Sequence, residues 1–283
     1  MPGTASASPT STRRPLEPLR NCIHQVPVDG TDHGAGTVNT ALASRPDRFD
    51  RIDALRGVAM VWMLVFHFCF DLNLYGYLQP RQAFTRDPFW TLQRTCIVSL
   101  FVFCAGFSQA LALHAGQSWQ RFWRRWAQLA ACALLVSASS ALMFPRSWIW
   151  FGVLHGIAVM LIVCRLAAPL GRWLWLVGAL ALVLPSVVRL PLFDAPALQW
   201  LGLVSRKPLT EDWVPIFPWL GVMLWGMAAG QWLVHRRSRL LVGGLSRGIR
   251  PLAVLGRWSL SFYMLHQPVL IGALLGGRQL GWW

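Results

Sequence analysis

The chain has 283 residues, of which 55% are hydrophobic and only 13% are charged. Soluble domains carry about 25% charged residues, so this composition excludes an ordinary soluble domain and indicates a membrane protein. The mean hydropathy of +0.44 agrees with that class. The net charge is +15, but the basic residues fall between apolar blocks instead of forming one patch. That distribution is typical of loops facing anionic lipid, and it argues against nucleic acid as a partner.

The N-terminal segment is rich in Ser, Thr, Pro, Gly and Ala and has no helical period. It contains no apolar stretch of the kind that a signal peptide needs. We therefore expect residues 1–46 to be a disordered cytoplasmic tail and residues 47–283 to be the membrane domain. The six cysteines lack zinc-finger and CxxC spacing, and no residue is predicted to bind a metal.

From Val58 onward, apolar runs alternate with short basic breaks. About 20 helical residues cross the ~30 Å hydrocarbon core. Helices are the expected spanning element, because lipid cannot satisfy unpaired backbone groups. We predict an all-α, polytopic integral membrane helix bundle of about seven transmembrane helices. The predicted spans are 57–78, 95–120, 126–145, 147–164, 173–188, 213–234 and 258–277.

Basic residues near the ends of the predicted spans set their orientation. With the N-terminus inside, the inner segments carry more Arg and Lys than the outer segments. The sequence therefore predicts a cytoplasmic N-terminus and, for seven spans, an external C-terminus.

The first predicted span carries a stripe of polar and titratable residues. Arg56 and His67 differ by about 20° around a helix and by about 16 Å along its axis, so they share a face. Asp71 lies one turn beyond His67, and Asp53 lies one turn before Arg56. A charge at the bilayer centre costs at least about 2.5 kcal/mol, so such residues face protein or water. The stripe predicts a functional surface; a packing hydrogen bond from His67 is the alternative.

Two further histidines lie in apolar spans. His155 follows the outer start of its span, and His266 lies near the middle of the last span. Ser259, Tyr263 and His266 share one face of that span at spacings of four and three. Together with His67, these histidines at similar depth predict one polar cavity, although a lone membrane histidine is more often structural.

The segment before the sixth span combines carboxylates with prolines. Glu211 and Asp212 should lie at its outer mouth, and Pro215 and Pro218 fall in its first turns. Proline there either starts a helix normally or kinks it and frees carbonyls into a cavity. A solvated loop and a functional mouth are both compatible with this pattern.

Five segments, in order, resemble the catalytic-domain family of heparan-α-glucosaminide N-acetyltransferase, a group related to the acyltransferase-3 family. They are Arg51–Gly57, Phe101–Gly106, Phe151–His155, Phe217–Gly221 and Ser261–Pro268. The resemblance implies a transmembrane O- or N-acyltransferase that moves an acetyl group from cytoplasmic acetyl-CoA to a sugar or other cell-envelope acceptor. In the heparan branch the implicated histidine lies in the first outer loop. Residues 72–94 here contain no histidine, so His67 would have to serve instead.

Under this resemblance, Arg56 with Arg51 and Arg125 would hold the CoA phosphates, because guanidinium binds phosphate bidentately. The pantetheine arm would run along the first helix and bring the thioester to His67. The protein is then expected in the bacterial inner membrane. Its expected partners are membrane lipid and a glycan or other envelope acceptor, and the sequence leaves a homo-oligomer open.

In the same hypothesis, His67 is a general base or, less favoured, an acyl-carrying nucleophile. Asp71 would orient its imidazole, and His266, Tyr263 or His155 would donate to the developing oxyanion. Two other classes of function stay open. A proton-coupled transporter would use the buried His and Asp residues as relays, and a non-catalytic subunit would use the stripe for helix packing.

Overall fold

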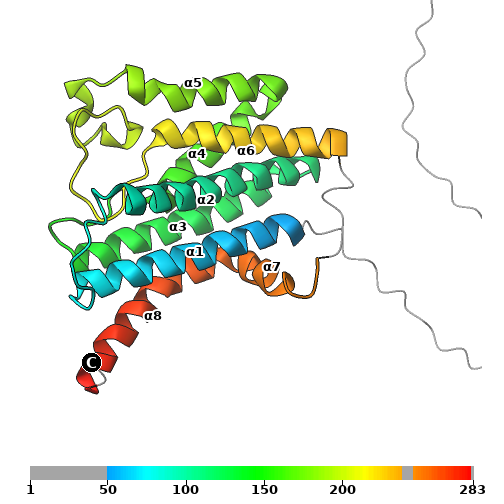
Figure 1. Cartoon of the computed structure of the whole chain (residues 1–283). Helices are drawn as coiled ribbons and strands as arrows, with labels where there is room; N and C mark the ends of the chain where they lie inside the picture. Colours follow the sequence, from blue (N-terminus) through cyan, green and yellow to red (C-terminus); the bar gives the residue numbers. More distant parts are fainter. Residues whose placement is uncertain (1–49, 238–244, 282–283) are drawn as a thin grey trace, which may run out of the picture. The chain divides into compact units, whose positions relative to one another are not determined.

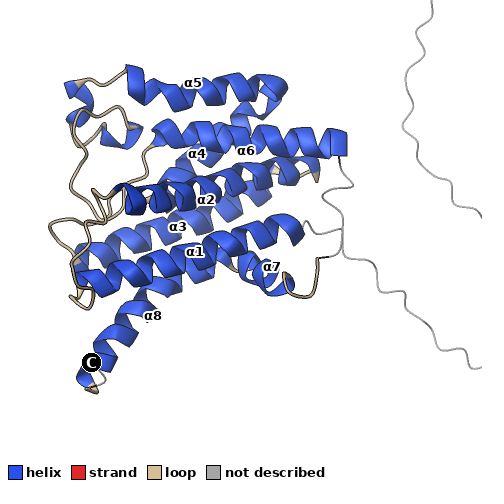
Figure 2. Cartoon of the chain, viewed as in Figure 1, coloured by secondary structure: helices blue, strands red, loops and turns tan. Residues whose placement is uncertain are grey.

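The computed structural model describes residues 50–237 and 245–281, so the predicted tail lies outside the described residues. The described part is built from helices, as Figure 2 shows, and its β-type pairing is one isolated bridge between Phe151 and Trp213. The α-helices are α1 Asp50–Leu74, α2 Pro88–His114, α3 Trp119–Met143, α4 Val153–Ala167, α5 Leu174–Val187, α6 Ile216–Arg237, α7 Arg250–Arg257 and α8 Ser259–Gln279. Three short 3-10 helices are η1 Ala168–Trp173, η2 Pro191–Asp194 and η3 Gln199–Leu201.

The all-α membrane class predicted from the sequence is confirmed, and each predicted span overlaps an α-helix. Among the residues that the structure describes, five stretches are long and apolar enough to cross a membrane. They are Asp50–Leu74, Pro88–His114, Trp119–Met143, Val153–Val187 and Ser259–Gln279. The count of seven spans is not confirmed: α4 and α5 fall within one of the five stretches, Val153–Val187, which Gly171 breaks at φ +54, and α6 is not one of the five. The 15 and 14 residues of α4 and α5 rise only about 22 and 21 Å.

The boundary of α2 shows why span ends were predicted less well than span centres. The helix begins at Pro88, before the predicted start at residue 95. The Asp87 side chain accepts a hydrogen bond from Phe89 N at 2.8 Å and caps the helix, and proline is well suited to the first turn. Capping chemistry therefore placed the helix start outside the charge-free run.

Helices α2 and α6 lie side by side in parallel (Figure 1) and make a close, extensive contact. A Cβ on Gly106 would lie 2.0 Å from Met223 O, and a Cβ on Gly226 would lie 2.2 Å from Phe103 O. Only glycine permits this backbone approach. The pair forms the centre of the largest core cluster, to which α4 also contributes.

Helix α7 packs antiparallel to the first half of α1. Gly57 and Gly256 permit the contact, since a Cβ on Gly256 would lie 1.7 Å from Asp53 O. Arg257 pairs with Asp50 at 2.6 Å and with Asp53 at 3.7 Å. These contacts hold α7 and α8 against α1, and α8 then runs along α1 toward His67.

Candidate active site

Helices α1 and α8 bring His67 and His266 together. Their ring centroids lie 5.0 Å apart, with the ring planes at 59°. Nδ1 of His67 and Nε2 of His266 are both buried and have no hydrogen-bond partner in the described part of the chain. Of the three histidines that the sequence predicted to meet, these two do so.

The protonation of His266 follows from its backbone contact. Its Nδ1 lies 2.7 Å from the carbonyl oxygen of Tyr263. A carbonyl can only accept, so Nδ1 carries the hydrogen and Nε2 of the neutral ring carries a lone pair. The Tyr263 ring lies 5.6 Å from the His266 ring, and Phe66 meets His67 edge-on at 5.7 Å. The imidazoles are therefore framed by aromatic rings.

Asp71 is fully buried and connects α1 to α8. Its Oδ1 accepts a hydrogen bond from Nε2 of Gln267 at 2.8 Å. The structure has no hydrogen bond between Asp71 and His67, which the hypothesis of direct orientation requires. Asp71 is instead hydrogen-bonded to Gln267, the residue that follows His266 on α8. Oδ2 of Asp71 and Oε1 of Gln267 stay buried without a partner among the described residues.

His155 lies at a different corner, where α3 meets the start of α4. Its Nε2 is 3.1 Å from Ser137 Oγ, and its Nδ1 accepts from Gly152 N at 3.3 Å. Ser137 donates to Ile149 O at 2.6 Å, so its oxygen accepts from His155. Both imidazole nitrogens are thus used locally, and the ring contacts of His155 are to Phe151 instead of α1 or α8.

A cavity of about 180 Å³ opens where α1 begins and α2 ends. Arg56 and Arg125 both line it, as two of the three predicted phosphate-binding residues. Arg56 donates to Ser108 Oγ and lies 3.4 Å from Asp53. Arg51 is exposed and does not line the cavity. We call this end of the bundle the basic end; its arginines include Arg51, Arg56, Arg121, Arg124, Arg125, Arg165 and Arg257.

Two glutamines of this cavity were not predicted. Gln109 is 6% exposed, and its Nε2 is buried without a partner in the described chain. Gln117 accepts from Arg165 Nη1 at 2.9 Å through its side chain and from Nη2 at 2.8 Å through its carbonyl. Arg165 also lies 4.2 Å above the Trp119 ring. The cavity therefore presents cations and amide donors, a combination suited to phosphate or carbonyl groups.

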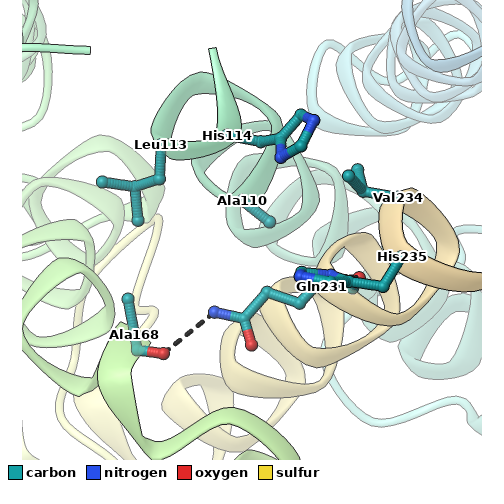
Figure 3. Close-up of a pocket in the computed structure, with 7 residues that line it drawn as sticks. All are labelled: Ala110, Leu113, His114, Ala168, Gln231, Val234 and His235. Atoms are coloured by element: carbon teal, nitrogen blue, oxygen red, sulfur yellow. Dashed lines mark hydrogen bonds between the residues drawn. The ribbon is translucent and has the colours of Figure 1, made fainter. Parts of the chain in front are cut away.

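A second cavity of about 290 Å³ lies between the ends of α2 and α6 and the start of η1 (Figure 3). His114 and His235 border it with ring centroids 6.3 Å apart. Gln231 donates to Ala168 O at 2.9 Å, as the dashed line in Figure 3 marks. Ala110, Leu113 and Val234 make much of the remaining wall apolar. Both histidines lie at helix ends and are exposed.

At the opposite end of the bundle, the segment before α6 pairs with the segment before α4. Glu211 N donates to Ser147 O at 2.9 Å, and Val214 N donates to Phe151 O at 3.3 Å. Ser147 Oγ also donates to Glu211 Oε1 at 2.5 Å. The loop that the sequence left as either solvated or functional is thus held against the bundle, next to the start of α4.

The protein-family comparison agrees with this architecture. The family model described as heparan-alpha-glucosaminide N-acetyltransferase, catalytic, matches residues 48–268. The match begins just before α1, ends within α8 and includes the His67–His266 pair and both arginines of the cavity. No curated protein and no solved structure matches this chain. The family resemblance that the five sequence segments suggested is thereby confirmed.

Proposed function

Because the chain belongs to the heparan-α-glucosaminide N-acetyltransferase catalytic-domain family of membrane acetyltransferases, we propose that it transfers acetyl from acetyl-CoA to a cell-envelope sugar. Acetyl-CoA would enter at the basic end, which would face the cytoplasm of a bacterial inner membrane. The acceptor would enter at the opposite end. The observation that carries the proposal is the contact between half-buried His67 and buried His266, with His67 on the same helix as Arg56, which lines a cavity about 16 Å away.

The basic end would bind the donor. Arg56 and Arg125 would pair with phosphates, and Gln109 would donate to an amide carbonyl of pantetheine. Sites for whole small molecules have about 300–1,000 Å³, so the cavity of about 180 Å³ would hold only part of CoA. Exposed Arg51 would meet phosphates outside it. An extended pantetheine arm is on the order of 15–20 Å long by its bond lengths, enough to carry the thioester toward His67.

His67 would act as the general base. The acceptor O–H or N–H gives its proton to His67 while its oxygen or nitrogen bonds to the thioester carbon. The C–S bond then breaks, and His67 returns the proton to sulfur, so the products are acetylated acceptor and CoA thiol. Because His266 Nε2 carries a lone pair, neutral His266 would stabilise protonated His67 instead of donating to the oxyanion. The Tyr263 hydroxyl is then the better oxyanion donor.

The test is acetyl-CoA binding and turnover by the purified full-length chain in detergent. His67→Gln should abolish transfer and leave acetyl-CoA affinity within about twofold of wild type, since the base does not hold the phosphates. Arg56→Gln should weaken acetyl-CoA binding by about 10- to 150-fold, because hydrogen bonds to charged groups contribute about 1.5–3 kcal/mol.

The matched control is Arg146→Gln, which removes an exposed arginine at the opposite end and should leave donor affinity unchanged. Equal losses in Arg56→Gln and Arg146→Gln would mean that net charge, not the cavity, binds the donor. Full transfer by His67→Gln would contradict the mechanism. Solute movement in sealed vesicles without CoA, together with no acetyl-CoA binding, would instead identify a carrier.

A further inference from the structure

Helix α7 has an exposed face at the basic end of the bundle, beside the start of α1 (Figure 1). At 100° per residue, Arg250, Val254 and Arg257 lie within about 60° of one another around the helix. Val254 is 51% exposed, and Trp258, directly after the helix, is 67% exposed. The other side of α7 contains buried Gly256 and packs on α1. The exposed face therefore combines arginines with uncovered apolar side chains.

Two arginines at this face have no acidic partner. Asp50 and Asp53 of α1 are both paired with Arg257, at 2.6 and 3.7 Å. Arg247, in the turn before α7, and Arg250, in its first turn, are exposed. Within residues 50–237 and 245–281 neither forms an ion pair. Two guanidinium groups are thus free to bind an anion from outside the described chain.

An anionic phospholipid matches this face better than a dissolved anion does. Arginine binds phosphate bidentately, and tryptophan beside it favours the boundary between headgroups and acyl chains. A dissolved phosphate would leave Val254 and Trp258 in contact with water, whereas a lipid covers them with its acyl chains. Each arginine near an anionic lipid surface contributes about fivefold to binding. A lipid with a net negative charge therefore gains more here than a zwitterionic lipid.

We propose that the exposed face of α7 is a binding site for an anionic phospholipid. Arg247 and Arg250 bind its phosphate, and Val254 and Trp258 lie against its acyl chains. None of these residues lines the donor cavity, so the site is separate from it. Because α7 packs on α1 directly beside Arg56, the bound lipid stabilises the bundle next to that cavity. Lipid binding of this kind does not depend on the proposed acetyl transfer.

The test measures lipid binding to the full-length chain in detergent by native mass spectrometry. The probes are dioleoylphosphatidylglycerol and dioleoylphosphatidylcholine, and wild type should bind the anionic lipid at least about tenfold more tightly. Changing Arg247→Gln and Arg250→Gln together should weaken binding of the anionic lipid by about 25-fold, because two contributions of about fivefold are lost. Binding of phosphatidylcholine should stay within about twofold of wild type, since its net charge is zero.

The matched control is Arg81→Gln with Arg86→Gln, which removes two exposed arginines at the opposite end. It should leave the affinity for phosphatidylglycerol within about twofold of wild type. Equal losses in the two double variants would mean that the lipid follows net charge, and that result overturns the site. Equal binding of the two lipids by wild type overturns it as well.

Two competitors separate the lipid from other sources of phosphate. Millimolar glycerol 3-phosphate and acetyl-CoA should each leave phosphatidylglycerol bound. Displacement by glycerol 3-phosphate would identify a site for soluble phosphate, and displacement by acetyl-CoA would assign Arg247 and Arg250 to the donor. Either result overturns the lipid site. Acetyl-CoA binding is measured separately, so its absence contradicts the proposed function and not the lipid site.

Discussion

Replacing Gly106 by alanine should push α2 and α6 apart. The new Cβ would lie 2.0 Å from the carbonyl oxygen of Met223 and 2.9 Å from its carbonyl carbon. Because these atoms belong to the backbone, no rotamer change can relieve the clash, and the helices must move. Overpacking of this kind costs about 1–3 kcal/mol. For a chain of this size that corresponds to a melting temperature about 2–12 °C lower.

Gly272→Ala in α8 is the matched control for the same chemical change. A Cβ at Gly272 meets nothing within 4 Å, so alanine there should gain up to about 1 kcal/mol from its higher helix propensity. The assay is thermal unfolding of both variants in one detergent. Gly106→Ala should also weaken acetyl-CoA binding, because Ser108 and Gln109 lie within one turn of it and line the donor cavity.

The reasoning fails if Gly106→Ala melts with wild type or if both variants are destabilised equally. The first result would mean that the two helices separate at no cost. The second would mean that loss of glycine flexibility, and not the close approach to Met223, determines stability.

Three further changes test other parts of the structure. Arg165→Lys keeps the charge but loses the two-pronged contact with Gln117, so stability in thermal unfolding should fall by about 1.5–3 kcal/mol and acetyl-CoA affinity should fall with it. His155→Ala removes the donor to Ser137 Oγ and leaves the Gly152 N–H without its acceptor, so it should cost about 1–3 kcal/mol while donor affinity stays unchanged. Burial raises the pKa of Asp212 above 3.8, so wild type should lose stability relative to Asp212→Asn as pH rises past that value.

Each of these has an outcome that contradicts it. Donor affinity lost in His155→Ala would place His155 in the donor site after all. Arg165→Lys with wild-type stability would mean that a single ammonium contact replaces the guanidinium. A stability difference between wild type and Asp212→Asn that does not change with pH would mean that the folded and unfolded chains bind the Asp212 proton equally.

The helices of this bundle could be predicted from the sequence because each is a local property of the chain. Apolar runs of spanning length fix their existence, and the stripe from Arg56 to Asp71 follows from the helical repeat alone. The number of spans is harder to predict, because it depends on which helices are long enough to cross the bilayer. The break at Gly171 falls between the predicted spans 147–164 and 173–188, but the helices on its two sides have only 15 and 14 residues.

The partners within the site depend on which helices meet, and sequence spacing does not contain that information. The helices that carry His67, His155 and His266 could be predicted, but the direction in which each ring points could not. His155 bonds to Ser137, 18 residues away, whereas His67 meets a residue almost 200 positions later. Gln109 was missed because a single buried amide in an apolar helix has no distinctive pattern; only its unpaired nitrogen beside Arg56 identifies it.

The two ends of the bundle carry different charged and polar side chains, so the two substrates of the proposed reaction would bind at separate ends. Two arginines and two glutamines line the donor cavity, whereas the Asp212 carboxylate lies at the opposite end, within electrostatic range of Arg94 and Lys207. Moving a charge to the bilayer centre costs at least about 2.5 kcal/mol, so neither CoA phosphates nor a charged acceptor should travel that far. With His67 between the two ends, only an uncharged thioester and an O–H or N–H group must reach the imidazole. Transfer across the membrane then requires passage of an acetyl group and not of either charged substrate.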